Sequence, residues 1–339
     1  MTSQRLTTIL RVAVATLAAA VIGVVAVFAY NIYLDRQAAI QSTPALRVVA
    51  AYEKIVRAQP NNAPNRVRLG EAYAAAGQYQ KAIEQLNAAI KIDEKHPGAY
   101  LDLGLVAMIN NEKTEAIKYF KQVVTLTDAA ATRNTDAKRE LALYNLGKMA
   151  LDDKDYEQSV GYFKEALRIR RDASDTYLLL ARAFDGLGDS ASAIKNVEYS
   201  LAFDPNFSQA NYQAGEYYLR EKNYLKASEH IRKAIDVAPE APEPQELLKK
   251  LGTAEAWVAK VNDQRGTDPA EALTSVKIAR RIDPESAAIA VLHGQVLERL
   301  GKQEEALVTY KEALKLDTSN AKAKAAIKRL EAEKPKKTE

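Results

Sequence analysis

Small residues recur along this chain at a fixed interval, and this interval limits what the chain can fold into more than any other feature. Seven such residues are separated by 34, 43, 34, 34, 45 and 34 positions: Ala82, Ala116, Ser159, Ala193, Ala227, Ala272 and Ala306. The two longer intervals fit a unit of 34 residues that carries an insertion. A constant period of this length predicts an array of stacked units, each covering the apolar face of its neighbour.

The composition indicates that these units are helical. The chain of 339 residues has only 14 Gly and 11 Pro, and it is rich in Ala, Leu, Lys and Glu. These residues lose little conformational freedom in a helix, whereas Gly and Pro disfavour one. We therefore predict an all-α fold.

The residues at this period resemble the tetratricopeptide repeat (TPR) family. The Leu-Gly pair of the first helix is present as Leu69-Gly70, Leu103-Gly104 and Leu146-Gly147, and the second-helix aromatic residue as Phe120, Phe163 and Tyr310. The resemblance implies a right-handed superhelical solenoid of about seven helix pairs. These repeats begin near Ala63, Pro97, Glu140, Ser174, Ser208, Thr253 and Ala287.

The spacing also predicts the segments of the chain. Insertions are expected near residues 131–139 and 242–252, the two places where the interval exceeds 34. The other predicted segments are an N-terminal flank (1–11), a transmembrane helix (12–34), a juxtamembrane stretch with a covering helix (35–62), the repeat array (63–320), a capping helix (321–333) and a disordered tail (334–339).

Residues 12–34 contain no charged side chain, and Phe28, Tyr30 and Tyr33 gather near the end of this run. A helix of this length would span about 35 Å, compared with about 30 Å for the hydrocarbon core of a bilayer. We predict a single membrane-spanning helix. A cleaved signal peptide and a buried core helix are the alternatives, and Val27-Phe28-Ala29 is an acceptable cleavage site.

The basic residues that flank this run predict its orientation. Arg5 and Arg11 precede it together with the α-amino group, while Arg36 and then Arg47 follow it. The positive-inside rule places the N-terminus in the cytoplasm. The expected location is therefore the cell membrane, with a single pass and an extracytoplasmic repeat domain.

Several kinds of chemistry are excluded or disfavoured. The chain has no Cys and three His, and it lacks the phosphate-loop, G-x-S-x-G and H-E-x-x-H motifs. The net charge of +4 is too small to predict nucleic-acid binding. Gly186 and Gly188 fall at a turn between helices, which explains them better than a phosphate loop does. We predict no enzyme activity, no cofactor and no metal.

The resemblance implies that ligands bind along the first helices, where the family uses positions 2, 5, 9, 12 and 13 of each repeat. Position 5 is apolar or aromatic in all seven repeats here, and it holds no Lys of the kind that clamps a peptide carboxylate. We predict an apolar groove that binds a protein segment. Its expected contact residues are Leu101, Leu105, Met108, Ile109, Tyr144, Lys148, Leu178, Arg182, Tyr212 and Trp257.

Two functions are compatible with this surface. The chain is either a membrane-tethered adaptor or assembly factor that binds partner segments in the groove, or a structural subunit of a membrane complex that uses its convex face and insertions. In either case the predicted partners are other proteins and the membrane. A further alternative is that the chain itself covers the apolar residues of the groove.

Overall fold

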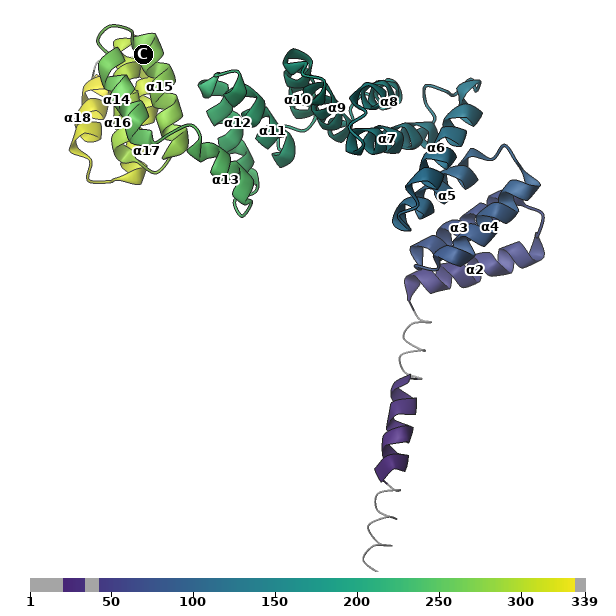
Figure 1. The fold of residues 1–339 in the computed structure, drawn as a ribbon. Helices are drawn as coiled ribbons and strands as arrows, with labels where there is room; N and C mark the ends of the chain where they lie inside the picture. Colours follow the sequence, from purple (N-terminus) through teal and green to yellow (C-terminus); the bar gives the residue numbers. More distant parts are fainter. Residues whose placement is uncertain (1–20, 34–42, 333–339) are drawn as a thin grey trace, which may run out of the picture. The chain divides into compact units, whose positions relative to one another are not determined.

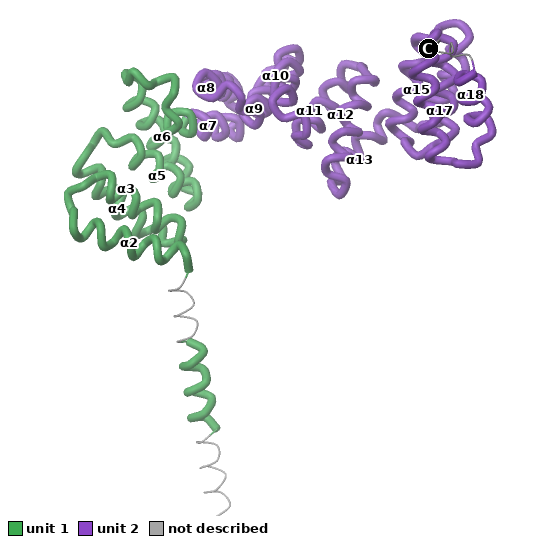
Figure 2. Tube along the Cα trace, turned by 180° about the vertical axis from the view of Figure 1, so that it is seen from behind, with its two compact units in different colours: residues 1–142 green, residues 143–339 purple. Residues whose placement is uncertain are grey.

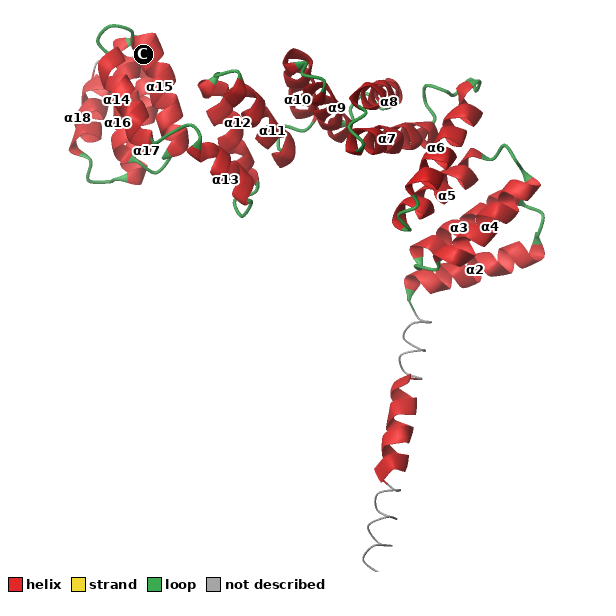
Figure 3. Cartoon of the chain, viewed as in Figure 1, coloured by secondary structure: helices red, strands yellow, loops and turns green. Residues whose placement is uncertain are grey.

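The computed structural model describes residues 21–33 and 43–332, and the regular structure in these residues is helical (Figures 1 and 3). The predicted all-α array of stacked helix pairs is thereby confirmed. Contacts between Cα atoms divide the chain into two compact units, residues 1–142 and 143–339 (Figure 2). Each unit is described separately below.

The predicted transmembrane helix over residues 12–34 is wrong. Residues 12–20 and Leu34 lie outside the described residues, and the helix over residues 21–33 is about 20 Å long at 1.5 Å per residue. Among the described residues, no helix combines the length and the apolar character needed to cross a bilayer. This finding also overturns the predicted single-pass location in the cell membrane with an extracytoplasmic repeat domain. The predicted flank (1–11) and tail (334–339) lie outside the described residues as well.

The first unit contains a covering helix and two helix pairs. Its helices are α2 (Pro44–Ala58), α3 (Ala63–Ala75), α4 (Tyr79–Ile92), α5 (Pro97–Ile109), α6 (Lys113–Asp128) and the start of α7 (Ala137–Asp152). Helix α2 packs on α3, where Val49 and Val56 are buried and the Tyr73 hydroxyl donates to Glu53 Oε1 at 2.6 Å. The apolar edge of the first pair is therefore covered.

The first insertion lengthens two helices instead of forming one long loop. Both α6 and α7 have 16 residues, and a short turn region joins them. The side chain of Arg139 is 2% exposed and holds this turn region closed, because its guanidinium donates to Val124 O at 2.7 Å and to Asp128 Oδ1 at 3.0 Å. A buried charge is stable only when it is paired and hydrogen-bonded in this way.

The second unit continues the array from α7. Its further helices are α8 (Tyr156–Ile169), α9 (Ser174–Gly186), α10 (Ser190–Phe203), α11 (Ser208–Arg220), α12 (Tyr224–Val237), α13 (Pro242–Lys249), α14 (Ala254–Gln264), α15 (Pro269–Ile282), α16 (Ala287–Arg299), α17 (Gln303–Leu316) and α18 (Ala321–Ala332). The last helix, α18, packs on α17 and buries Ala323, Ala326 and Leu330. It closes the apolar end of the last pair.

Close packing within several of the pairs depends on a glycine that recurs in their first helices. A Cβ atom on Gly147 would lie 2.6 Å from the ring of Phe163, and one on Gly294 would lie 2.6 Å from the ring of Tyr310. Two carbon atoms cannot approach so closely. The aromatic residue of the second helix therefore leaves room only for a glycine at the facing position of the first helix. The spacing that relates the glycine to the aromatic residue is thus a packing rule of the fold.

The turn between the two helices of a pair requires a left-handed residue. Gly188 has φ of 76°, and Lys222 adopts φ of 56° at the equivalent turn of the next pair. A Cβ atom on Gly186 would lie 2.4 Å from the ring of Tyr156. Both glycines of the Gly186-x-Gly188 pair therefore have structural reasons, as their place at a helix turn predicts.

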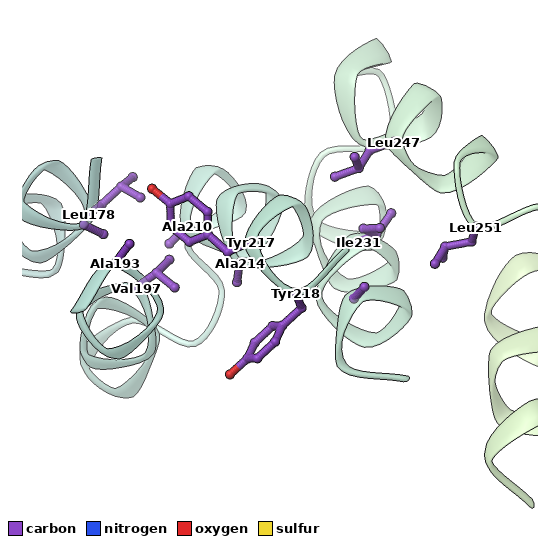
Figure 4. Packing of buried hydrophobic residues seen from close by; sticks show 12 residues of the cluster. Leu178, Ala193, Val197, Ala210, Ala214, Tyr217, Tyr218, Ile231, Leu247 and Leu251 are labelled. Atoms are coloured by element: carbon purple, nitrogen blue, oxygen red, sulfur yellow. The ribbon is translucent and has the colours of Figure 1, made fainter. Parts of the chain in front are cut away.

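The second insertion forms the short helix α13, which packs on α11 and α12. Its Leu247 and the following Leu251 are buried in one cluster with Ala214 and Ile231 (Figure 4). In this position α13 covers the fifth pair as the first helix of a sixth pair would. Beyond it, α12 contacts α15, and Arg232 Nε donates to Arg281 O at 2.7 Å.

Candidate functional site

The apolar side chains at position 5 of the repeats are mostly part of the core. Leu101 is 7% exposed, Leu178 is 2% exposed and Trp257 is 7% exposed. Leu178 lies in the same cluster as Ala193 and Val197 on the next helix (Figure 4). These three residues therefore stabilise the array and offer little surface to a partner.

Trp257 is covered by the chain itself. Its indole N–H donates to Leu251 O at 2.8 Å, and its ring meets that of Tyr224 edge to face at 5.8 Å between centroids. The ammonium of Lys260 lies 3.8 Å from the centroid of the indole ring. The segment that follows α13 thus occupies the place that a ligand of Trp257 would need.

In the first unit, the predicted contact residues become more exposed toward the end of α5. Leu105 and Met108 are half-buried, and Ile109 is 54% exposed. Among the predicted apolar contact residues of this unit, only Ile109 is mainly open to solvent. An isolated exposed apolar side chain is common on protein surfaces and does not define a site.

The two tyrosines at position 5 remain half-buried in the second unit. The Tyr144 ring meets Phe163 edge to face at 6.2 Å, and the ammonium of Lys148 lies 6.0 Å from the Tyr144 centroid. The Tyr212 hydroxyl donates to Glu216 Oε1 at 2.9 Å. Burial, together with the hydrogen bond to Glu216, raises the pKa of Tyr212 to about 12. Tyr212 is therefore a neutral hydrogen-bond donor at physiological pH.

A chain of polar contacts connects Tyr212 to the preceding pair. Arg182 Nε donates to Gln213 Oε1 at 3.2 Å, and Gln213 Nε2 donates to Glu216 Oε2 at 3.0 Å. Glu216 thus accepts from both Tyr212 and Gln213, and Arg182 on α9 is joined to α11. The sequence pattern identified Arg182 and Tyr212, but it gave no reason to single out Gln213.

This polar chain lies beside a pocket of about 260 Å³, which we call the α9–α11 groove. Its lining residues are Asp185, Gln213, Glu216, Leu219, Arg220, Leu247 and Lys250. Arg220 donates to Asp185 Oδ1 at 2.6 Å across the two first helices. Acidic and basic groups both line this groove, and the half-buried Leu219 provides apolar contact. The groove is suited to the mixed polar and apolar surface of a peptide.

Tyr217 lies in the core next to these charged groups. It is 2% exposed, and its hydroxyl has no hydrogen-bond partner among the described residues. The guanidinium of Arg220 lies 5.0 Å from the centroid of its ring. Burial raises the pKa of Tyr217, with the nearby carboxylate of Asp185 as the next cause. The tyrosine therefore stays neutral.

Two larger pockets lie near the C-terminal end of the second unit. One has a volume of about 680 Å³ and is lined by Arg265, Arg299, Lys322 and Arg329, with Glu298 as its acidic residue. Glu298 accepts from Tyr310 and from Arg329, both at 2.6 Å. The adjoining pocket of about 540 Å³ shares Arg265 and Lys322. These basic residues, which lie at the C-terminal end of α14 and on α16 and α18, are outside the predicted set of contacts.

Metal binding is not supported by the side chains that the structure places together. In residues 21–33 and 43–332, no three His, Asp or Glu side chains come close enough to hold a metal ion. The chain has no Cys.

Known proteins share this architecture. Protein-family models described as TPR repeat match residues 70–108, and models described as tetratricopeptide repeat match residues 97–129, 142–177, 178–242 and 263–321. The chain is also similar to the protein CTR9 homolog of Arabidopsis thaliana, at 32% identity over 75 residues. That match covers 22% of this chain and 7% of the relative, so the chain spans a small fraction of that protein.

The chain is also similar to solved structures. The chain is similar to YrrB, described as a TPR protein with an unusual peptide-binding site, at 18% identity and a TM-score of 0.50 over 59% of this chain and 98% of that one. It is also similar to pilF of Pseudomonas aeruginosa, at 16% identity and a TM-score of 0.44 over 80% of this chain and 97% of that one. At such identities the likeness concerns the fold alone. The family matches extend over more than half of the sequence, and the chain belongs to the tetratricopeptide repeat family.

Proposed function

We propose that this chain is a protein-interaction scaffold that holds a segment of a partner protein in the α9–α11 groove. The TPR fold supports a general role as a non-enzymatic adaptor or scaffold. The finer proposal concerns the place of binding and the residues that contact the partner. It rests mainly on one observation, the polar chain from Arg182 through Gln213 and Glu216 to Tyr212.

This polar chain is suited to a peptide because it joins donors and acceptors on a fixed support. Arg182 and Tyr212 are half-buried, and their helices are held by the core that contains Leu178 and Ala214. Positioned donors lose little side-chain entropy when a ligand binds, which favours affinity. The backbone of an extended segment offers the matching donors (N–H) and acceptors (C=O).

The proposed binding surface is more polar than the apolar groove that the sequence predicted. Because Leu178 and Trp257 are buried, apolar contact at the groove comes from the half-buried Leu219, while the buried Leu247 supports the groove from below. Leu247 belongs to α13, the helix formed by the second insertion. The insertion therefore contributes a wall to the groove as well as covering the fifth pair.

A peptide-display selection against the purified full chain would test this proposal. Peptides enriched in the selection should bind the unmodified chain and lose about tenfold or more in affinity with Arg182→Ala, since hot-spot truncation costs about 2 kcal/mol. Tyr212→Phe, which removes only the hydroxyl bonded to Glu216, should weaken binding by a smaller factor. Lys315→Ala is the matched control, because it removes one exposed positive charge on α17.

The result that contradicts the proposal is equally definite. Selected peptides that bind Arg182→Ala and Tyr212→Phe as tightly as the unmodified chain would place the contact elsewhere. Circular dichroism should show that the variants keep their helical content, because both residues lie at the edge of the core. A selection that enriches no peptide would also count against the groove.

A further inference from the structure

We propose that a second surface of the same unit binds an acidic segment of a partner protein. This surface, which we call the α8–α10 patch, surrounds a pocket of about 520 Å³ between α8, α9 and α10. Its lining combines four basic residues with three aromatic ones: Lys164, Arg168, Arg171 and Lys195, and Tyr177, Phe184 and Tyr199. No Asp or Glu lines this pocket.

The basic side chains of the patch lack acidic partners. All four are exposed, and none of them forms an ion pair with any residue that the structure describes. The acidic residue at the rim, Asp189, already caps α10 by accepting from Ser192 N at 3.0 Å. Like charges gathered on one surface repel each other, and a ligand that carries negative charge relieves this repulsion.

Aromatic rings form the apolar part of the patch. Tyr177 lies 5.4 Å from Tyr199 and stacks on Phe203 at 5.7 Å between ring centroids. Tyr199 is 44% exposed and Phe203 is 49% exposed. Large aromatic groups open to solvent beside uncompensated cations are typical of protein contact surfaces, where aromatic residues and Arg are enriched.

The arrangement of the rings favours carboxylates over nucleic-acid bases. The ammonium of Lys164 lies 5.0 Å from the centroid of Phe184, and that of Lys195 lies 5.8 Å from the centroid of Tyr199. Tyr177 and Phe203 stack on each other. Each of these rings thus already has a cation or another ring over one face, which leaves fewer faces for base stacking. Ring edges carry partial positive charge and complement carboxylates.

The distribution of the cations favours a segment with several acidic residues. Lys164 and Arg168 belong to α8, Arg171 to the following turn and Lys195 to α10, so the charges surround the pocket from separate elements. A partner segment with spaced Asp or Glu residues can reach them together. An apolar side chain between these acidic residues would contact Leu167 and Leu180 at the base of the pocket.

The patch and the α9–α11 groove have no lining residue in common, and this inference does not rest on the proposed function. On α9, Tyr177 and Phe184 are seven positions apart and share one face of the helix. Arg182 and Asp185 contact α11 from another face. Substitutions at Arg182 should therefore leave binding at the patch unchanged, so that either site can fail without the other.

The test uses the full chain and a fluorescent peptide of alternating Glu and Leu residues, followed by fluorescence anisotropy at low ionic strength. The Glu peptide should bind, and the same peptide with Gln in place of Glu should bind about tenfold more weakly or not at all, because charge complementarity is lost. Binding should weaken as salt is added. Single-stranded oligo(dT) is the competing probe.

Charge reversals locate the binding. Arg168→Glu and Lys195→Glu should each lower the affinity for the Glu peptide by about tenfold, whereas Lys315→Glu, a reversal on α17, should leave it unchanged. Because the substituted residues are exposed and form no ion pairs, the helical content should stay the same. Arg168→Gln and Lys195→Gln provide neutral variants should a reversal disturb folding, and they should weaken binding in the same direction.

Three results would overturn this proposal. The first is equal binding of the Glu and Gln peptides, or no binding of either. The second is a Glu peptide whose affinity is the same for Arg168→Glu, Lys195→Glu and the unmodified chain. The third is tighter binding of oligo(dT) than of the Glu peptide with the same sensitivity to these reversals, which would make the patch a nucleic-acid surface.

Discussion

The environment of His293 predicts that acid weakens the second unit. His293 lies on α16 at a position where the family has Leu, and its Nε2 atom is buried without a partner among the described residues. Its Nδ1 atom lies 3.3 Å from a guanidinium nitrogen of Arg280, which also donates to Glu312 at 3.1 Å. Burial, together with the positive charges of Arg280 and Lys277, lowers the pKa of His293 to about 4.

The sign and the size of the effect follow from this pKa. His293 stays neutral in the folded chain, while in the unfolded chain it takes up a proton below its ordinary pKa of about 6.5. The unfolded state therefore binds more protons between these two values, and the free energy of unfolding falls as the pH falls from about 6.5 to about 4. A difference of about 2.5 units corresponds to a total of about 3 kcal/mol, of which about 2 kcal/mol is lost by about pH 5.

Equilibrium unfolding in urea, measured at about pH 7.5 and about pH 5, provides the assay. Trp257 is the one tryptophan of the chain, and it lies in a cluster with Ile289 and Val296 on α16, so its fluorescence reports the unfolding of this region. The comparison is with His293→Leu, which fills the site with the family residue. Burial also lowers the pKa of His230, but that residue is present in both proteins and cancels in the difference.

The expected result is a loss of stability with acid that is about 2 kcal/mol smaller in His293→Leu than in the unmodified chain. If both proteins lose the same free energy of unfolding between the two pH values, His293 is not the neutral buried group described here. An unchanged m-value in urea is the control, because it shows that the same surface is exposed on unfolding.

Three further substitutions test the packing, a turn and a buried carboxyl group. Ala227→Leu should lower stability by about 1–3 kcal/mol in thermal unfolding, because Ala227 is fully buried and overpacking a core is costly; an unchanged melting temperature would contradict the repeat register. Lys222→Gly should raise stability by up to about 1 kcal/mol, because φ of 56° is strained for a residue with a side chain, and a decrease in the melting temperature would refute this. Burial and, next, the negative charge of Glu71 raise the pKa of Asp102 to about 7. As the pH rises from about 4 to about 7, Asp102 ionises in the unfolded chain but stays protonated in the folded chain, so the free energy of unfolding falls. In urea unfolding, Asp102→Asn should therefore be more stable than the unmodified chain at about pH 8 and equally stable at about pH 4. A difference in stability between the two proteins that does not change with pH would count against the raised pKa of Asp102.

The pairing of helices could be predicted from the sequence because its cause is local. Gly147 and Phe163 lie at fixed positions of one repeat. The Phe163 ring packs so close to Gly147 that a side chain there would collide with it. The same relation holds for Gly294 and Tyr310. A constraint of this kind recurs at a constant spacing, so the period of the sequence carries it directly.

The accessible surface could not be predicted in the same way, because it depends on contacts between repeats. Leu178 and Tyr212 both stand at position 5 of their repeats. Leu178 is buried, whereas Tyr212 is only half-buried. The covering of Trp257 depends on Leu251, which lies in an insertion with no counterpart in the other repeats. Gln213 became significant only through its partners, Arg182 and Glu216.

The charge of the second unit shows why totals along a sequence hide binding surfaces. The chain as a whole is nearly balanced at +4, and this balance alone gave no reason to expect a charged site. The folded chain separates the charges, because the α9–α11 groove pairs Asp185 with Arg220 while the α8–α10 patch gathers cations without acidic partners. One helix, α9, contributes side chains to both surfaces, and its buried Ala181 packs in the core. Because separate groups line the two surfaces, the double variant Arg182→Ala with Arg168→Glu should lose affinity for each ligand by the same factor as the corresponding single variant, as expected for sites without shared partners. Helix α9 would then take part in holding two different segments at once, which is the property that a scaffold requires.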